Sequence, residues 1–238
     1  MDPHSEPPFS AQDHLQDNKI HILLAASGSV ATIKIPNIAE ALGHHPNVSI
    51  RIIVTESAER FLAAQSAEQP LLDSLCNVPG VDGIYRDSDE WSRPWVRGAP
   101  ILHIELRKWA HILLVAPLSA NTMAKMTIGM ADNLLLSVLR AWDTTGLVDL
   151  GFKAKKPMVF LAPAMNTAMY VHPVTEKSLK ILRDEWGKSD ANPDGWVTIL
   201  PPIEKSLACG DAGTGGMMDW RDIVKNIQSY LELPIPDS

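Results

Sequence analysis

Cysteine is scarce in this chain of 238 residues, which contains only Cys76 and Cys209. Two cysteines are too few for a disulfide framework, and they favour a reducing compartment, which we expect to be the cytoplasm. Long apolar runs are also missing, because none approaches the roughly 18 residues that a membrane-spanning helix needs. The N-terminal residues lack the positively charged start and the apolar segment of a secretory signal. The sequence therefore predicts neither membrane insertion nor export.

Positive charge is in deficit, with 21 lysines and arginines against 28 acidic residues and a net charge of −7. No basic stripe is present, so a nucleic-acid partner is not expected. The patterns HExxH and CxxC are absent and the eight histidines are scattered, so we expect no metal site. The phosphate-binding patterns GxxxxGKS/T and GxGxxG and the nucleophile pattern GxSxG are absent too. These absences argue against a nucleotide P-loop, the standard dinucleotide fingerprint and the α/β-hydrolase elbow.

Short apolar runs alternate with helical patterns along most of the chain. Hydrophobic residues make up 45% and charged residues 21%, which is typical of a packed domain. The apolar runs indicate strands over residues 20–26, 48–54, 111–116, 158–162 and 196–200. The spacing between them indicates helices over residues 30–42, 55–64, 131–142, 175–186 and 220–231, and another that begins at Ser119. This order predicts an α/β fold with a doubly wound, Rossmann-like parallel sheet.

We expect one domain over residues 19–234. Residues 1–18 contain three prolines and several polar residues, and they are predicted to form a disordered tail. Residues 77–99 are rich in turn formers and predict an excursion at the surface or an interface. Residues 143–156 and 187–195 resemble loop insertions.

Small polar residues follow three of the predicted strands, just before a helix. Parallel strands end at one edge of a sheet, where ligands of doubly wound folds bind. Glycine allows a ligand close to the backbone, and a helix N-terminus offers unpaired N–H groups. These segments could bind a mononucleotide, although each is also explained as an ordinary helix cap. They contain Gly28, Ser29, Val30, Thr55, Ser57, Ser119, Ala120, Asn121 and Thr122.

Three side chains are candidates for chemistry. His103 lies among apolar residues, where a histidine satisfied by a backbone carbonyl is the simpler interpretation. Asn166 follows a predicted strand and could hydrogen-bond a carboxylate, although asparagine also suits a plain turn. Cys209 lies in a glycine-rich segment that suggests a flap, whereas Cys76 lies among leucines and suggests inert packing. Met165 and Met169 are expected to pack rather than to bind.

Seven segments, taken in order, resemble the flavin-containing cysteine decarboxylase family. They extend over about residues 20–233, and several independent matches in order are more specific than one short motif. The segments are SGSVATIK (27–34), HIELRKWA (103–110), APLSANT (116–122), ADNLL (131–135), RAWD (140–143), PAMNTAMY (163–170) and LACGDAGTGGM (207–217).

The resemblance implies an FMN-dependent lyase of coenzyme A biosynthesis, which converts phosphopantothenoylcysteine to 4′-phosphopantetheine. The implied route oxidises the substrate thiol to a thioaldehyde, releases CO2 and returns the electrons. It further implies a homotrimer, or a multiple of trimers, with active sites at subunit interfaces. Arg107 and Lys108 are candidates for the substrate phosphate, by proximity in sequence only. By position, the resemblance implies that His103 and Cys209 are catalytic. It implies that the substrate is bound by Asn166, Met169, Ala208 and Gly210. It implies that FMN is bound by Ala164 and by the nine strand-end residues above.

Two other functions remain open. Some relatives are flavin-binding regulators that inhibit a protein phosphatase, and others decarboxylate different cysteine-containing substrates. His103, Asn166 and Cys209 occur together in this chain, and no long acidic tail is present, which favours a self-sufficient enzyme. A flavin-free α/β domain is the remaining alternative.

Overall fold

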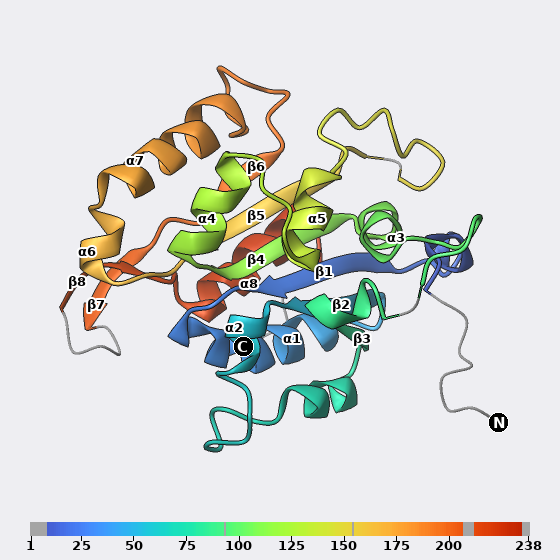
Figure 1. Ribbon diagram of the computed structural model, residues 1–238, viewed down its shortest axis with the longest axis horizontal. Helices are drawn as coiled ribbons and strands as arrows, with labels where there is room; N and C mark the ends of the chain where they lie inside the picture. Colours follow the sequence, from blue (N-terminus) through green and yellow to red (C-terminus); the bar gives the residue numbers. More distant parts are fainter. Residues whose placement is uncertain (1–8, 93, 154, 207–211, 235–238) are drawn as a thin grey trace.

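A parallel sheet of six strands forms the centre of the molecule (Figure 1). A computed structural model describes residues 9–92, 94–153, 155–206 and 212–234. The strand order is β3-β2-β1-β4-β5-β6, and a separate antiparallel pair, β7–β8, lies outside the sheet. The order reverses direction beside β1, so the topology is doubly wound as predicted. The strands are β1 (Ile20–Ala26), β2 (Val48–Val54), β3 (Val81–Arg86), β4 (Ile112–Leu118), β5 (Met158–Pro163), β6 (Val197–Ile199), β7 (Ile203–Ser206) and β8 (Ala212–Gly216).

Helices cover both faces of the sheet. On one face pack α1 (Ile35–Gly43) and α8 (Trp220–Tyr230). On the other pack α3 (Leu102–Trp109), α4 (Ala120–Thr127), α5 (Leu134–Arg140) and α7 (Pro173–Lys180). The shorter elements are η1 (Ala11–His14), η2 (Val30–Lys34), α2 (Glu56–Glu59), η3 (Leu72–Asn77), η4 (Asp87–Asp89), α6 (Thr167–Tyr170) and the π-helical turn η5 (Ile181–Glu185). None of the helices in the described part of the chain is long and apolar enough to cross a membrane.

Neighbouring side chains of a central strand enter different cores. Leu24 packs with α1 and α8, whereas Leu23 packs with α3 and α5 on the opposite face, and both are fully buried. A strand alternates its side chains between faces, so burial on both faces requires a continuous apolar run. This is why the short apolar runs of the sequence predicted the central strands correctly.

Three local predictions are wrong. Residues 77–99 are not only a surface excursion, because Val81–Arg86 pairs with β2 as the edge strand β3. The helix expected over residues 55–64 is a single turn, Glu56–Glu59. The tail expected over residues 1–18 is structured from Phe9 onward, where η1 begins at Ala11 with that side chain only 2% exposed.

Residues 9–18, the N-terminal segment, are held by an arginine in the sheet. The guanidinium carbon of Arg51 lies 4.0 Å from the centre of the Phe9 ring and 5.2 Å from that of Trp109. Phe9 also contacts Tyr85 of β3, with ring centres 6.1 Å apart. Ala11 N donates to Glu105 Oε2 on α3 at 2.9 Å. Aromatic rings over a desolvated cation stabilise such contacts, which explains the order of this segment.

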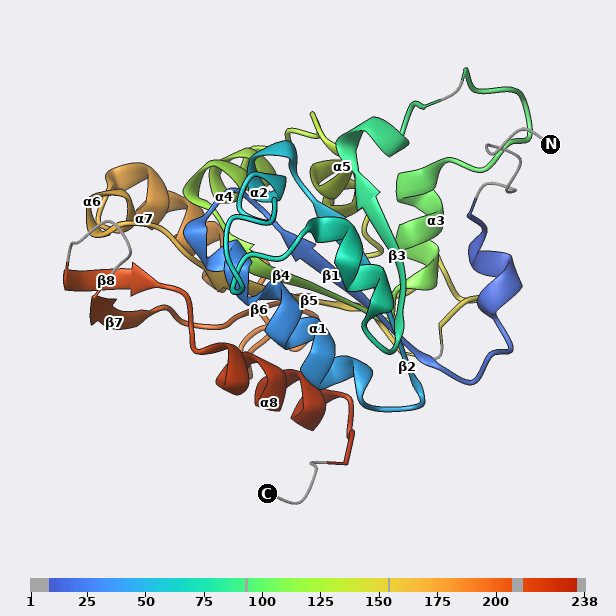
Figure 2. The same cartoon turned by 90° about the horizontal axis from the view of Figure 1, so that it is seen from below.

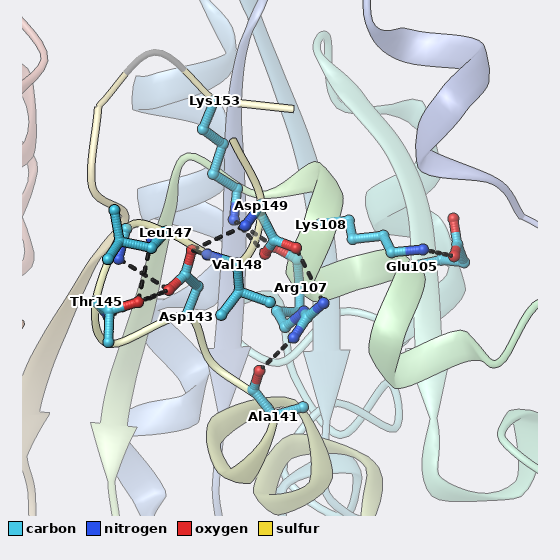
Figure 3. A network of polar contacts seen from close by, with 11 residues as sticks. Glu105, Arg107, Lys108, Ala141, Asp143, Thr145, Leu147, Val148, Asp149 and Lys153 are labelled. Carbon is cyan, nitrogen blue, oxygen red and sulfur yellow. Dashed lines mark hydrogen bonds and ion pairs between the residues drawn. The ribbon is translucent and has the colours of Figure 1, made fainter. Parts of the chain in front are cut away.

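Residues 143–156 form a loop organised by one buried carboxylate (Figure 3). Asp143 accepts hydrogen bonds from the backbone N–H groups of Gly146 at 2.8 Å and of Val148 and Asp149 at 3.0 Å each. Burial alone would raise the pKa of Asp143, but these bonds and that from the Thr145 hydroxyl outweigh it and hold the pKa at about 2. The predicted insertion is therefore an ordered loop.

Candidate functional site

A pocket of about 680 Å³ opens at the carboxyl ends of β1, β4 and β5. Figure 1 shows β1 pointing toward the side of the molecule where α6 and the β7–β8 pair lie. The volume falls within the usual range of small-molecule and cofactor sites. Besides the loops that follow the strands, the wall includes the end of β8 and the start of α8, from Gly215 to Trp220.

The loop after β1 brings backbone close to the neighbouring strand end. A Cβ atom on Gly28 would lie 2.5 Å from Ser57 Oγ, so a larger residue does not fit there without movement. Ser29 has extended backbone and caps η2, and its hydroxyl accepts from Ala31 N; Ser29, Val30 and Ala31 all line the pocket. Backbone N–H groups at such a turn form a cradle for an anion.

A buried serine connects the ends of β1 and β4. Ser27 is fully buried, and its hydroxyl donates to Pro117 O at 3.1 Å and accepts from Ser119 N at 2.8 Å. Ser119 in turn caps α4 by accepting from Thr122 N at 3.3 Å. These bonds fix the start of α4 beside the loop after β1, so both loops face the same pocket.

Asn166 is the cap of α6 at the end of β5. Its Oδ1 accepts from Met169 N at 2.8 Å, which assigns the amide orientation. Its Nδ2 has no hydrogen-bond partner among the described residues, so two N–H donors remain available to a ligand. Met165 N donates to Gly215 O at 2.9 Å, which attaches the end of β8 to this wall. Gly215 has a φ of +112°, a conformation that favours glycine.

Most of the residues predicted to bind the cofactor lie in this pocket, together with Asn166 and Met169. They are Gly28, Ser29, Val30, Ser119, Ala120, Asn121 and Ala164. Thr55 and Thr122 lie behind the wall, 4% and 2% exposed, and Ser57 contacts Gly28 without lining the pocket. Met169 is 51% exposed, so the expectation that it is a packing residue is wrong, whereas Met165 is 8% exposed. Ala208, Cys209 and Gly210 lie outside the described residues.

His103 does not lie in the pocket. It occupies the first turn of α3, and this helix lies away from α6 and β8 in both Figure 1 and Figure 2. Its Nδ1 is 2.8 Å from Glu90 Oε1, so its partner is a carboxylate rather than the backbone carbonyl of the simpler interpretation. One protomer therefore does not bring His103 and Asn166 together.

Sequence reasoning missed several pocket residues. Lys34, at the end of η2, is the only lysine or arginine among the described lining residues, and it has no ion-pair partner there. The available signal was its position in the sequence, five residues after Ser29 and just before the next helix. The apolar lining adds Ile33, Phe61, Met217, Met218 and Trp220.

The cations proposed for a phosphate are engaged elsewhere. Arg107 donates to Asp149 Oδ1 at 2.9 Å, and Lys108 donates to Glu105 Oε1 at 2.9 Å. Neither lines the pocket. Cys76 is exposed, so its assignment to packing is also wrong. Within the described ranges, no group of three or more His, Cys, Asp or Glu side chains could hold a metal ion.

A family model described as Flavoprotein matches residues 10–232. The chain belongs to this family. The pocket of this flavoprotein suits a flavin nucleotide, because its volume is sufficient and apolar side chains of the lining can flank a flat ring.

Curated relatives of this flavoprotein include enzymes and a longer protein. A phosphopantothenoylcysteine decarboxylase of Arabidopsis thaliana is 42% identical over 90% of this chain and 86% of its own length. A protein of Schizosaccharomyces pombe named probable thymidylate synthase is also 42% identical, over 92% of this chain but only 30% of its own length. The resemblance inferred from the motifs is therefore confirmed.

Solved structures show the same fold. A cysteine-to-serine mutant of PPC decarboxylase complexed with pantothenoylaminoethenethiol has a TM-score of 0.72 at 40% identity, covering 90% of this chain and 99% of that one. The FMN binding protein AtHal3 has a TM-score of 0.67 at 39% identity, covering 91% of this chain and 99% of the other.

Proposed function

We propose that this flavoprotein is a cytoplasmic, FMN-dependent decarboxylase that converts phosphopantothenoylcysteine to 4′-phosphopantetheine in coenzyme A biosynthesis. The observation that carries the proposal is the amide of Asn166, a residue of the pocket lining, whose Oδ1 is fixed by its bond to Met169 N and whose Nδ2 has no partner among the described residues. A neutral donor suits a substrate carboxylate that must be held and then lost as CO2. The relatives named phosphopantothenoylcysteine decarboxylase and PPC decarboxylase support the same substrate.

The cofactor would occupy the strand ends from Gly28 to Val30 and from Ser119 to Thr122. Bound FMN supplies an acceptor that takes two electrons from the substrate thiol carbon and later returns them. Asn166 orients the carboxylate, and His103 accepts a proton as the thiol carbon is oxidised. Cys209 then donates a proton to the decarboxylated ene-thiolate. Ala164 contacts the cofactor, and Met169, Ala208 and Gly210 contact the substrate.

We further infer that the active site forms between subunits of a homotrimer. His103 lies outside the pocket that contains Asn166, so one protomer lacks a complete set of reacting groups. Large apolar side chains near His103 are exposed, with Trp91 at 64% and Trp95 at 52%. A partner covering this surface would bring its own pocket against His103, and exposed aromatic side chains are typical of such contacts.

Lys34 is the cation that we assign to a phosphate group, either that of FMN or that of the substrate. Replacing it by methionine keeps the length of the side chain and removes the charge. If it binds the substrate phosphate, Lys34→Met raises KM for the phosphorylated substrate and leaves that for the dephosphorylated analogue unchanged. If it binds the cofactor, the variant loses affinity for FMN but not for riboflavin. Equal behaviour of wild type and variant in both assays would contradict the assignment.

The proposed function predicts a coloured protein with a defined product. Purified protein should show an oxidised flavin spectrum, and denaturation should release FMN rather than FAD. Incubation with phosphopantothenoylcysteine should release CO2 and form 4′-phosphopantetheine without net oxidation. Cys209→Ser should still release CO2 but accumulate the ene-thiol.

A colourless protein that does not bind added FMN would contradict the proposal. A yellow protein inactive on this substrate is tested next on a panel of other cysteine-containing acids. The same protein is also tested for binding and inhibition of a protein phosphatase, which is the activity expected of a regulator.

A further inference from the structure

Glu90 places a buried carboxylate against His103. The Nδ1 atom of His103 is 2.8 Å from Glu90 Oε1. The Glu90 side chain is only 4% exposed, whereas that of His103 keeps 22% of its surface exposed. The second carboxylate oxygen, Oε2, is buried and has no hydrogen-bond partner in the described part of the chain. The carboxylate of Glu90 is thus covered, whereas the imidazole of His103 remains partly accessible to solvent.

The backbone that carries Glu90 is fixed on both sides of the preceding turn. Asp87 of η4 accepts from Leu134 N at 3.0 Å and from Glu56 N at 3.3 Å, which attaches the turn to α5 and α2. Asp89 accepts from Arg86 N at 2.7 Å, which closes the turn on the end of β3. These bonds leave Glu90 little freedom to follow a moving histidine.

The pair determines which histidine nitrogen carries the proton. An ionised carboxylate can only accept, so the hydrogen of the His103 ring must be on Nδ1. Nε2 then presents a lone pair, and it has no hydrogen-bond partner among the described residues. A carboxylate in this position also stabilises the imidazolium that forms when Nε2 accepts a proton.

A structural role alone accounts poorly for this acid. A buried carboxylate with one unpartnered oxygen destabilises the folded state, whereas a neutral side chain could bond the ring with a smaller penalty. Glu105 of α3, the helix that carries His103, shows the contrast, because its two oxygens accept from Ala11 N and Lys108 Nζ. In Glu90, by contrast, only Oε1 has a partner among the described residues.

We propose that Glu90 is a positioning residue that holds His103 with Nδ1 protonated and Nε2 free to accept a proton. This proposal rests on the proposed function for the step in which His103 acts, but the tautomer itself does not depend on it. Glu90 touches neither the substrate nor the cofactor in this assignment, and it acts through His103.

The first experiment measures the tautomer in the holoenzyme. Protein labelled with ¹⁵N in histidine is compared with Glu90→Gln and with Glu105→Gln, a matched loss of a buried carboxylate on α3. Imidazole ¹⁵N shifts of wild type and Glu105→Gln should show a protonated Nδ1 and an unprotonated Nε2 for His103. In Glu90→Gln a substantial share of His103 should change to the other tautomer. An unchanged His103 signal in Glu90→Gln would overturn the proposal.

The second experiment separates positioning from folding. Glu90→Gln should lower kcat by about 10²- to 10⁴-fold, with KM within about twofold and FMN content unchanged. Glu90→Asp should recover part of kcat, because it restores a charged acceptor. In a His103→Asn background, Glu90→Gln should cause no further loss of activity or of flavin content.

The outcomes distinguish this proposal from the proposed function. An additional loss in the His103→Asn background, or Glu90→Gln with normal kcat, would assign Glu90 to structure and overturn the proposal. If wild type releases no CO2 from the substrate, the proposed function fails, and the ¹⁵N measurement still decides how Glu90 acts on His103.

Discussion

The side-chain amide of Asn166 caps α6 through its oxygen and is assigned to the substrate carboxylate through its nitrogen. A substitution can separate these two roles. Asn166→Asp keeps an oxygen for Met169 N, so the α6 cap remains, but it removes the free donors and adds a charge beside the substrate carboxylate. We expect decarboxylation to fall at least about 100-fold while Tm changes little, because one charge-assisted bond can contribute about 3 kcal/mol. Steady-state kinetics and thermal unfolding measure the two effects. Normal turnover by Asn166→Asp would remove this residue from substrate binding.

A substitution at Gly28 tests whether FMN binding depends on the close approach of the loops that follow β1 and β2. A methyl group there would meet Ser57 Oγ at 2.5 Å and push the loop after β1 out of position. We expect Gly28→Ala to weaken FMN binding by roughly 10- to 100-fold, as 1–3 kcal/mol of overpacking would do. Flavin fluorescence titration measures this. Gly151→Ala is the control, because no atom lies within 4 Å of the added group; equal FMN affinity in the two variants would contradict the role of Gly28.

The loop of residues 143–156 depends on a single carboxylate for its shape. Asp143→Ala removes the acceptor of several backbone N–H groups, among them those of Gly146 and Val148. Leaving them without partners should lower the free energy of unfolding by about 2–4 kcal/mol. Hydrogen exchange should accelerate first at these amides and then at Asp149, which anchors Arg107. Unchanged exchange at Gly146 and Val148 would mean that other contacts hold the loop.

The elements differ in how far the sequence predicts them. The central strands are buried on both faces, so their local apolar runs are sufficient. The edge strand β3 has one buried residue, Val81, and the polar residues and Gly83 of the same run indicate a turn. Its place in the sheet comes from pairing with β2, a contact between distant segments that periodicity does not contain. The turn after β3 carries Glu90, so missing this strand also concealed the partner of His103.

At the scale of the whole molecule, stability should decrease in moderately acidic solution. Burial, with the nearby charges of His21 and Lys153, lowers the pKa of His111 to about 4, against attraction by Asp17. Burial also lowers the pKa of His21. In the unfolded chain His111 has its ordinary pKa of 6.5, so it binds a proton at a higher pH than it does in the folded chain. Its contribution to the free energy of unfolding is therefore complete above pH 6.5 and is lost as the pH falls toward 4. His111 alone accounts for about 3 kcal/mol.

Chemical denaturation between pH 7.5 and 4 measures this loss. His111 Nδ1 accepts from His21 N at 2.8 Å, and an asparagine oxygen can accept the same bond. His111→Asn therefore keeps the contact and removes one titrating group, so its stability should depend less on pH. Exposed His44 provides the control, since His44→Asn should leave the slope as it is in wild type. An equally steep profile in His111→Asn would assign the acid loss to other groups.

The fold and the position of the pocket could be predicted, because a doubly wound sheet gathers its strand ends at one edge. Gly28, Ser119 and Asn166 follow three different strands and meet there. His103 is the informative exception. Its motif pointed to chemistry, but no pattern in one chain shows that the residue lies on a different part of the protomer from the pocket.

The contact between the N-terminal segment and Arg51 has a practical consequence for producing the protein. Expression beginning at residue 19, the boundary suggested by the sequence, would delete Phe9 and uncover the rings of Tyr85 and Trp109 beside the guanidinium of Arg51. Such a shortened product would be prone to self-association during purification. Affinity tags are better fused ahead of Met1 or beyond Ser238 than put in place of the N-terminal segment.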